Sequence, residues 1–160
     1  MIGQQAAGKT VFAKKLGERL AIPVVHLDAI VNGEGRDKAR AGELIRAAVE
    51  KPDWIMDGNA FTSDRNARLE RADHIFLFTS HPAIALARHV RRWARGESEA
   101  GDGRSEGLHL GFAANFAFVR WPKREREIVA DAHALGKNLI LVKNRRTAED
   151  YVKTLSFMEA

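Results

Sequence analysis

The spacing of residues 3–10 constrains the fold of this chain more than any other feature. These residues read Gly-Gln-Gln-Ala-Ala-Gly-Lys-Thr, which matches the pattern G-x-x-x-x-G-K-T. In that pattern, a glycine-rich turn between a strand and a helix wraps backbone N–H groups around phosphate groups, the lysine reaches the outer phosphates and the hydroxyl binds Mg²⁺. A glycine-rich turn without a ligand is the alternative. The pattern predicts a phosphate site formed by Gly3, Gln4, Gln5, Ala6, Ala7, Gly8, Lys9, Thr10 and Val11.

The residues on either side of this loop differ in how well they fit the pattern. After the loop, Phe12, Leu16 and Leu20 recur at helical spacing with charged residues between them. The loop therefore opens onto a helix N-terminus, where the helix dipole and free N–H groups favour phosphate. Before the loop stand only Met1 and Ile2, whereas a strand usually has about five or six residues. We expect a truncated first strand, and a native chain that starts upstream of Met1.

The rest of the chain alternates between strand and helix patterns. Short apolar runs that suit buried parallel strands occupy residues 24–28, 54–56, 73–79 and 138–143. Helical patterns occupy residues 36–50, 64–71 and 82–95, then residues from 112 onward with a break before Pro122, and finally residues from 147 onward. This rhythm predicts an α/β fold in which helices cover both faces of a parallel sheet. We expect a single domain over residues 1–160, because the chain is long enough for one core.

Composition narrows the classes of protein that remain. Hydrophobic residues make up 45% of the chain and charged residues 29%, values that are ordinary for a globular protein. No apolar run approaches the roughly 18 residues of a membrane span, and a secretory signal has no room before the loop, so we expect a soluble cytoplasmic protein. The chain has no cysteine, which excludes disulfides and thiolate metal sites. Its net charge of +5 suits a polyanion, a phosphate-rich site or plain solubility.

The ends of the predicted strands supply the candidates for chemistry, because ligands of parallel α/β sheets bind at that edge. Lys9 is predicted to reach the β- and γ-phosphates, and Thr10 to bind Mg²⁺. Asp57 ends one apolar run and is assigned to the outer shell of the metal. Asp28 ends another and is assigned to the acceptor hydroxyl, as its orienter or base. The alternative for either acid is a cap on a neighbouring helix or turn.

Several further residues are candidates for binding the acceptor or the nucleotide. Asn59, Arg65 and Arg68 follow the Asp57 turn and could hold an acceptor with an anionic group. Surface pairing of the two arginines with Asp64 or Glu70 is an equally open alternative. Arg145 and Arg146 follow the last strand and could border the nucleotide base. The histidines lack metal-ligand spacing, so no zinc site is expected, and for His26 a structural role is favoured over contact with the acceptor.

The helix predicted at residues 82–95 separates its side chains into two faces. At 100° per residue, Ala83, Leu86, Val90 and Trp93 share one face, and the opposite face carries Arg88, Arg91, Arg92 and Arg95. Like charges at this spacing destabilise a helix by roughly 0.2–0.5 kcal/mol per pair, and a polyanionic ligand would relieve them. A glycine-rich stretch follows, so we expect a lid at about residues 88–111 with Arg88 and Arg92 as catalytic residues. A solvated basic face is the alternative.

Taken together, these motifs resemble those of the adenylate-kinase-like P-loop kinases, and among them most closely those of the bacterial DNA topology modulation protein family. The resemblance rests on the phosphate loop, on His26-Leu27-Asp28, on residues 54–59, on Arg68 before Ala72-Asp73, on the arginine-rich helix and on residues 144–146. It implies a three-layer P-loop NTPase fold with a parallel sheet in the order 2-3-1-4-5. It also implies Mg-ATP at the loop and an arginine-bearing lid.

The chain departs from these relatives around the acceptor. The family pattern has a tyrosine after the Gly-Asn pair and an aspartate at the end of the fourth strand, where this chain has Ala60 and Thr79. Adenylate kinases proper carry an arginine shortly after the Asp-Gly turn, and residues 60–62 contain none. A nucleoside monophosphate is therefore not assured as the acceptor.

The resemblance and the motifs lead to one expected function and one alternative. We expect an ATP- and Mg²⁺-dependent phosphotransferase that acts on a small-molecule or nucleotide acceptor, as a monomer or homodimer. A GTPase is disfavoured because residues 142–145 do not form the guanine-reading Asn-Lys-x-Asp pattern. The alternative is a nucleotide-binding regulatory protein that affects DNA topology, with little or no kinase activity.

Overall fold

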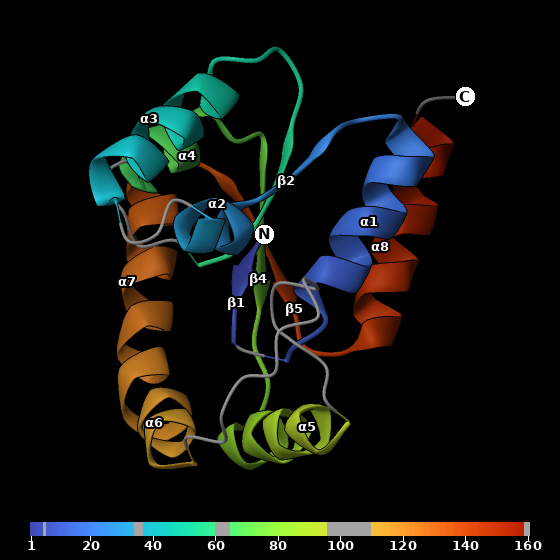
Figure 1. The fold of residues 1–160 in the computed structure, drawn as a ribbon. Coiled ribbons are helices and arrows are strands. Elements are labelled where there is room, and N and C mark those ends of the chain that lie inside the picture. The colour runs from blue at the N-terminus through green and yellow to red at the C-terminus, as the bar shows by residue number, and fades with distance from the viewer. Residues whose placement is uncertain (5, 34–36, 60–64, 96–109, 159–160) are drawn as a thin grey trace.

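Helices cover both faces of a set of parallel strands in the computed structural model, which describes residues 1–4, 6–33, 37–59, 65–95 and 110–158. On one face lie α1 (Lys9–Leu20) and α8 (Arg145–Met158). On the other face lie α3 (Lys38–Val49), α4 (Arg65–Arg71) and α7 (Trp121–Ala134), as Figure 1 shows. The predicted three-layer α/β fold is therefore confirmed.

The strands are parallel and pair largely as expected. They are β1 (Ile2–Gly3), β2 (Val24–His26), β3 (Ile55–Asp57), β4 (His74–Phe78) and β5 (Asn138–Val142). Strand β2 pairs with β3, while β4 lies between β1 and β5. These pairings fit the order 2-3-1-4-5, except that β3 and β1 are not joined by a strand ladder.

Met1 makes the connection between these two groups of strands. The backbone N–H of Gly58 donates to the Met1 carbonyl oxygen at 3.2 Å, and the Met1 amino group donates to the carbonyl oxygen of Met56. Strand β1 has just two residues, so its hydrogen bonds suffice for a ladder with β4 but not for a second ladder with β3. The short first strand expected from the sequence is thus visible in the sheet.

Side chains alternate between the two helical layers along β4. Phe76 and Phe78 pack against Phe12 of α1, with ring centroids 5.1 and 5.6 Å apart. Ile75 and Leu77 face the opposite layer, where Leu77 contacts Trp121 and Ile128 of α7. A strand buried on both faces reads as a continuous apolar run, which is why the sequence predicted this strand so clearly.

The apolar run at residues 24–28 forms a shorter strand than the sequence predicted. Strand β2 ends at His26, and α2 (Leu27–Gly33) begins at the next residue. Asp28 therefore lies in the first turn of a helix rather than at the end of a strand. An acidic side chain in this position is favourable because it faces the positive end of the helix dipole. Leu27 is buried, so the apolar run continued past the end of the strand.

Pro122 stands within a long helical path, where a break was predicted. This path runs through α6 (Leu110–Asn115), the π-helix η1 (Phe116–Arg120) and α7. A proline lacks the N–H group and its ring clashes with the preceding turn. A wider π-turn just before it removes this conflict without ending the helix. Neither this path nor any other helix in the described ranges is long and apolar enough to cross a membrane.

The last helix begins earlier than the sequence pattern indicated. Helix α8 starts at Arg145 and not at Thr147. The reason is a side-chain cap: Asn144 Oδ1 accepts the backbone N–H of Thr147 at 2.9 Å and its hydroxyl at 3.2 Å. Such a cap satisfies a free N–H group of the first turn and fixes where the helix starts. As a result, both arginines predicted near the nucleotide lie in the first turn of α8.

Candidate active site

The phosphate loop leads into α1 with an open, uncapped helix end. Ala6 and Gly8 adopt left-handed backbone conformations, with φ of 54° and 92°. Gly8 is the N-cap of α1, and no side chain of the described residues caps this helix. A Cβ atom added at Gly8 would meet nothing within 4 Å in the described part of the chain. Free N–H groups beside open space form the kind of site that binds phosphate.

Lys9 places its ammonium group inside the curve of this loop. The residue is 9% exposed, and Nζ donates to the carbonyl oxygens of Gly3 at 3.0 Å and Gln4 at 2.8 Å. The predicted role of Lys9 requires a cation within reach of phosphates bound by the loop, and its buried position satisfies that requirement. Thr10 is half-buried in the first turn of α1, whereas Val11 is exposed.

Two side chains hold the loop to the strands beside it. Asn59 donates from Nδ2 to the Gly3 carbonyl oxygen at 2.6 Å, and its Oδ1 accepts the Gly3 N–H at 3.0 Å. Gln4, which is 2% exposed, accepts at Oε1 from the backbone N–H and the hydroxyl of Ser80. The Asn59 amide therefore replaces the strand ladder that is missing between β3 and β1. Sequence reasoning had assigned Asn59 to the acceptor and missed the Gln4–Ser80 contact, for which the sequence contains no local signal.

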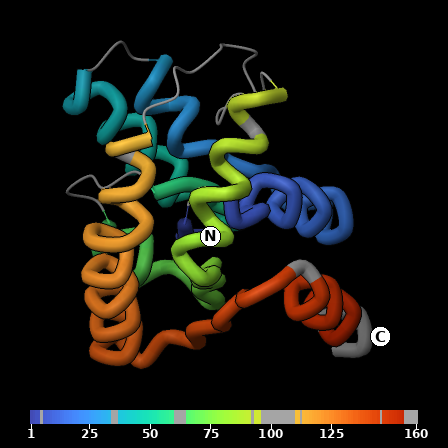
Figure 2. The backbone as a smooth tube through the Cα atoms, turned by 90° about the horizontal axis from the view of Figure 1, so that it is seen from below, coloured from blue at the N-terminus to red at the C-terminus, as the bar shows by residue number. Residues whose placement is uncertain are grey.

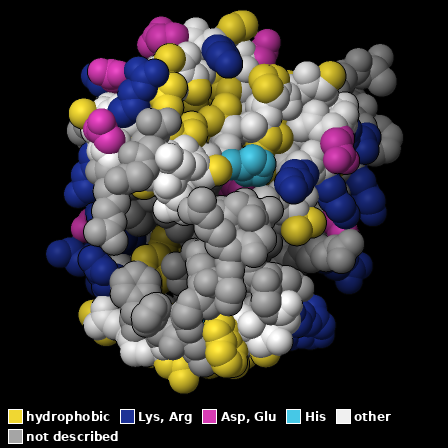
Figure 3. Space-filling model, viewed as in Figure 1, with side chains coloured by type: hydrophobic (Ala, Val, Ile, Leu, Met, Phe, Trp, Pro, Cys, Tyr) yellow, Lys and Arg dark blue, Asp and Glu magenta, His cyan; other side chains and the backbone are white. Residues whose placement is uncertain are grey.

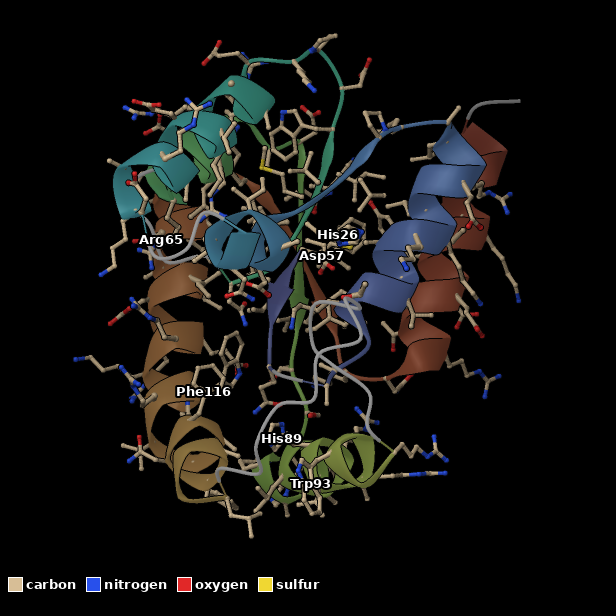
Figure 4. All side chains as sticks on the ribbon, viewed as in Figure 1. His26, Asp57, Arg65, His89, Trp93 and Phe116 are labelled. Carbon is tan, nitrogen blue, oxygen red and sulfur yellow. The ribbon has the colours of Figure 1, made fainter. Side chains whose placement is uncertain are left out.

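Asp57 is a buried carboxylate at the carboxyl end of β3. It is 4% exposed, and Oδ2 lies 3.3 Å from Nδ1 of His26. Its other oxygen, Oδ1, has no hydrogen-bond partner among the described residues. Figure 4 shows His26 and Asp57 side by side near the centre of the molecule. A carboxylate oxygen that is buried and unpartnered fits a ligand for Mg²⁺ or for a water molecule on it.

Asp28 reaches the same region from α2. A Cβ atom added at Gly58 would lie 3.2 Å from Cγ and Oδ1 of Asp28. Gly58 follows Asp57 directly, so the two predicted acids lie on either side of one glycine. The structure thus brings the phosphate loop, Lys9, Asp57 and Asp28 to one edge of the sheet, although Asp28 comes from the first turn of α2 and not from the end of a strand.

The charges around Met1 show how closely these groups are packed. Burial lowers the pKa of the Met1 amino group from 8.0 to about 5. The carboxylate of Asp57 opposes this shift, while the positive charges of Arg68 and Lys9 add to it. All three side chains are buried. One acid and two cations therefore share a region of low dielectric, in which electrostatic interactions are stronger than in water.

The two arginines predicted to bind the acceptor lie in different environments. Arg68 is 7% exposed on α4 and belongs to the group of charges just described. Arg65 instead forms an ion pair with Asp131 of α7 and approaches Glu127 of the same helix. Figure 4 shows Arg65 beside α7, well away from Asp57. The structure therefore does not bring Arg65 to the predicted site.

Helix α5 (Pro82–Ala94) crosses the edge of the sheet where the phosphate loop lies, as Figure 2 shows from below. Arg88 and Arg91 on this helix and Arg95 just after it are exposed. The apolar face is rotated from the prediction, because Ala85 is buried while Ala83 and Trp93 are exposed. Residues 96–109 of the lid predicted at about 88–111 lie outside the described residues, as do Gln5 and the side chains of Arg92 and Arg145. Arg146 is exposed at the start of α8.

A small pocket lies between this helix, the phosphate loop and the helical path that follows. Its lining combines Gln4 with Ala85, Leu86 and His89 of α5 and with Ala113, Phe116 and Ala117. Figure 4 shows His89 on α5 and Phe116 across from it. Gln4 connects the phosphate loop to this region. Its side chain lines the pocket and accepts hydrogen bonds from Ser80, which lies just before α5.

Comparison with known proteins identifies the fold. No protein-family model matches the chain, and no curated protein sequence does. Among solved structures, the chain is similar to the shikimate kinase from Bacteroides thetaiotaomicron, with a TM-score of 0.61 and 18% sequence identity. The match covers 99% of this chain and 96% of that chain. The chain therefore shares the overall fold of this shikimate kinase over nearly its whole length.

Proposed function

We propose that this chain is an ATP-dependent P-loop kinase that moves the γ-phosphoryl group of Mg-ATP to a small-molecule or nucleotide acceptor. The observation that carries the proposal is the convergence at one edge of the sheet of the open end of α1, the buried ammonium group of Lys9 and the unpartnered oxygen of Asp57. Phosphoryl transfer depends mainly on positioning and on neutralising charge. The fold shared with a shikimate kinase supports the same activity class.

Each group at this edge has a role in the proposed reaction. The loop backbone and Lys9 bind the β- and γ-phosphates. Thr10 and Asp57 hold Mg²⁺, which when bound neutralises charge on the transferring group. Asp28 orients the acceptor hydroxyl and accepts its proton. Arg88 and Arg92 of α5 are the proposed cations for the charge that develops on the phosphoryl group.

The structure supports the remaining proposed contacts to different degrees. Arg68 is buried and, like Lys9 and Asp57, affects the pKa of the Met1 amine, which supports a role in binding an anionic acceptor. Arg65 could contact an acceptor only after its ion pair with Asp131 is broken. Arg145 and Arg146 lie at the start of α8, which is compatible with a place beside the nucleotide base. Asn59 contributes indirectly by holding Gly3 in place.

The decisive test is transfer of radiolabelled γ-phosphate from ATP to a panel of nucleotides, nucleosides, sugars and small alcohols. We expect Lys9→Ala to lower any observed transfer by at least about 100-fold, because it removes the cation that contacts the phosphates. Lys14→Ala is the matched control, since Lys14 is exposed on the same helix. Equal transfer by the wild type and Lys9→Ala would contradict the proposed site. We expect Arg92→Ala to lower turnover more than ATP binding.

The exposed arginines of α5 support a second candidate function. It is the nucleotide-binding regulatory role that the resemblance to the DNA topology modulation family implies, with little or no kinase activity. Arg88, Arg91 and Arg95 could contact phosphates of DNA. Binding of that kind weakens by several orders of magnitude as salt rises. A fluorescence titration with duplex DNA at increasing salt tests it, and absent or salt-insensitive binding would exclude this role.

A further inference from the structure

His26 contacts Asp57, and the proposed reaction gives this histidine no role. The two residues are register partners at the ends of the parallel strands β2 and β3, so their side chains leave the same face of the sheet. Nδ1 of His26 lies 3.3 Å from Oδ2 of Asp57, and the side chains are 35% and 5% exposed, respectively. Figure 3 shows a histidine side chain reaching the surface near the centre of the face where Figure 4 places His26.

The packing of α1 shows which face this is. A Cβ atom added at Gly17 of α1 would lie 2.6 Å from Cγ2 of Val24 and 3.9 Å from Cδ1 of Ile55. Val24 and Ile55 are also register partners, and they point toward α1. The intervening Val25 and Met56 pack into the opposite cluster with α3. His26 and Asp57, two residues further along, therefore also face α1.

The direction of α1 brings this pair close to the metal ligand proposed in its first turn. The helix runs back along the strands from the phosphate loop (Figure 1). Two strand residues advance about 6.6 Å, which corresponds to about four residues of helix. The pair therefore lies level with the part of α1 that precedes Gly17 by about one turn, toward Thr10. Asp57 thus lies on the face of the sheet that α1 covers, less than one further helical turn from the level of Thr10.

The two oxygens of Asp57 differ in their surroundings. His26 contacts Oδ2, whereas Oδ1 has no hydrogen-bond partner in the described part of the chain. A buried carboxylate oxygen without a partner is costly, and native proteins leave few such atoms unsatisfied. Mg²⁺ and its bound water molecules are suitable partners because the ion prefers carboxylate oxygen ligands. A fixed contact at Oδ2 also determines where Oδ1 points.

We infer that His26 is the positioning residue of the metal-binding carboxylate: its Nδ1–H donates to Oδ2 of Asp57 and thereby aims Oδ1 at the metal ion of the bound nucleotide. The inference rests on the proposed function, because it requires Mg-ATP at the loop. It assigns the imidazole proton to Nδ1. Partners of this kind, one contact away from the metal, orient its ligands, and their removal typically weakens metal binding about 10- to 100-fold.

The experiment compares binding of the non-hydrolysable analogue AMP-PNP with Mn²⁺ and with EDTA, by calorimetric titration of the full chain. The ratio of the dissociation constant in EDTA to the dissociation constant with Mn²⁺ measures how much the metal strengthens binding. We expect His26→Leu to lower this ratio about 10-fold or more, while binding in EDTA changes less than about twofold. His26→Asn should restore most of the ratio, because the asparagine amide can donate from nearly the position of Nδ1. His133→Leu is the matched control, since His133 is exposed on α7.

The possible outcomes separate failure of this inference from failure of the proposed function. If Asp57→Asn lowers the ratio but His26→Leu does not, His26 does not position the carboxylate and the proposed kinase site stands. If His26→Leu weakens binding equally in EDTA, the histidine is merely structural and the inference is wrong. If the wild type does not bind AMP-PNP in either condition, the proposed function itself fails. Should His26→Leu not fold, His26→Ala against His26→Asn provides the same comparison.

Discussion

At the scale of single residues, Gly58 determines how the acids of the site are arranged. Its φ of 135° lies in a region that side chains rarely adopt. A Cβ atom there would lie 3.0 Å from Cβ of Leu27 and 3.2 Å from the carboxyl group of Asp28. Glycine thus allows α2 to begin directly beside the end of β3. The sequence analysis selected Asp57-Gly58 for the carboxylate. The glycine is equally important, because it lets α2 begin beside the end of β3.

We therefore expect Gly58→Ala to destabilise the protein by about 1–3 kcal/mol, because the new methyl group adds backbone strain and crowds Asp28. In urea denaturation we expect a lower midpoint concentration, with an unchanged dependence of the unfolding free energy on urea concentration. Gly111→Ala is the matched control: Gly111 lies in α6, and a Cβ atom there would meet nothing within 4 Å of the described chain. Equal midpoints for the two variants would show that the turn tolerates a side chain.

The site residues proposed from the sequence differ in how far along the chain their contacts reach. Lys9 and Thr10 follow from a local motif, and Asp57 from the end of an apolar run, so neither prediction needs distant contacts. Asn59 and Arg65 were assigned to the acceptor, yet Asn59 binds Gly3, 56 residues away, and Arg65 binds Asp131, 66 residues away. Such partners become neighbours through the order of strands and helices. Residue spacing alone could not identify them.

At the scale of elements, the termini of helices depend on single side chains. Helix α3 begins after Asp37, whose Oδ1 accepts the N–H groups of Ala39 and Arg40, each at 3.0 Å. The periodicity of residues 36–50 predicted this helix well, and its cap set the first residue. Helix α2 was not predicted at all, and the start of α8 was misplaced. Apolar periodicity does not show where a strand gives way to a helix or which side chain caps it.

The cap of α3 gives a direct test of this role. We expect Asp37→Ala to lower the free energy of unfolding by about 1 kcal/mol, since two N–H groups of the first turn lose their acceptor. Thermal and urea denaturation measure the loss. Asp53→Ala removes an exposed acid outside any helix or strand and controls for the change in net charge. A loss of the same size in both variants would assign the effect to charge rather than to capping.

At the scale of the whole molecule, the sheet depends on a very short strand. Strand β1 connects to β4 by a ladder, but to β3 only by contacts of Met1 and by the Asn59 side chain, among the residues described. The resemblance implied the order of the strands, which the pairings fit in part. The sequence itself predicted a short first strand, because strand length is a local property. It could not show that an asparagine side chain would substitute for the missing backbone ladder.

In a chain that starts at Met1, this arrangement makes stability depend on pH through the Met1 amine. The Met1 amine has a pKa of about 5 in the folded chain, against 8.0 when it is free in water. Between these values the unfolded chain binds more protons, so stability rises with pH from 5 to 8 and levels off above 8. The full difference is on the order of 4 kcal/mol. Urea denaturation at several pH values measures it, and a variant with Gly-Ser added before Met1 is the control. That variant keeps every histidine but moves the amine into solvent, so it should lose most of the slope, whereas an equal slope in both proteins would show that the Met1 amine is not the titrating group.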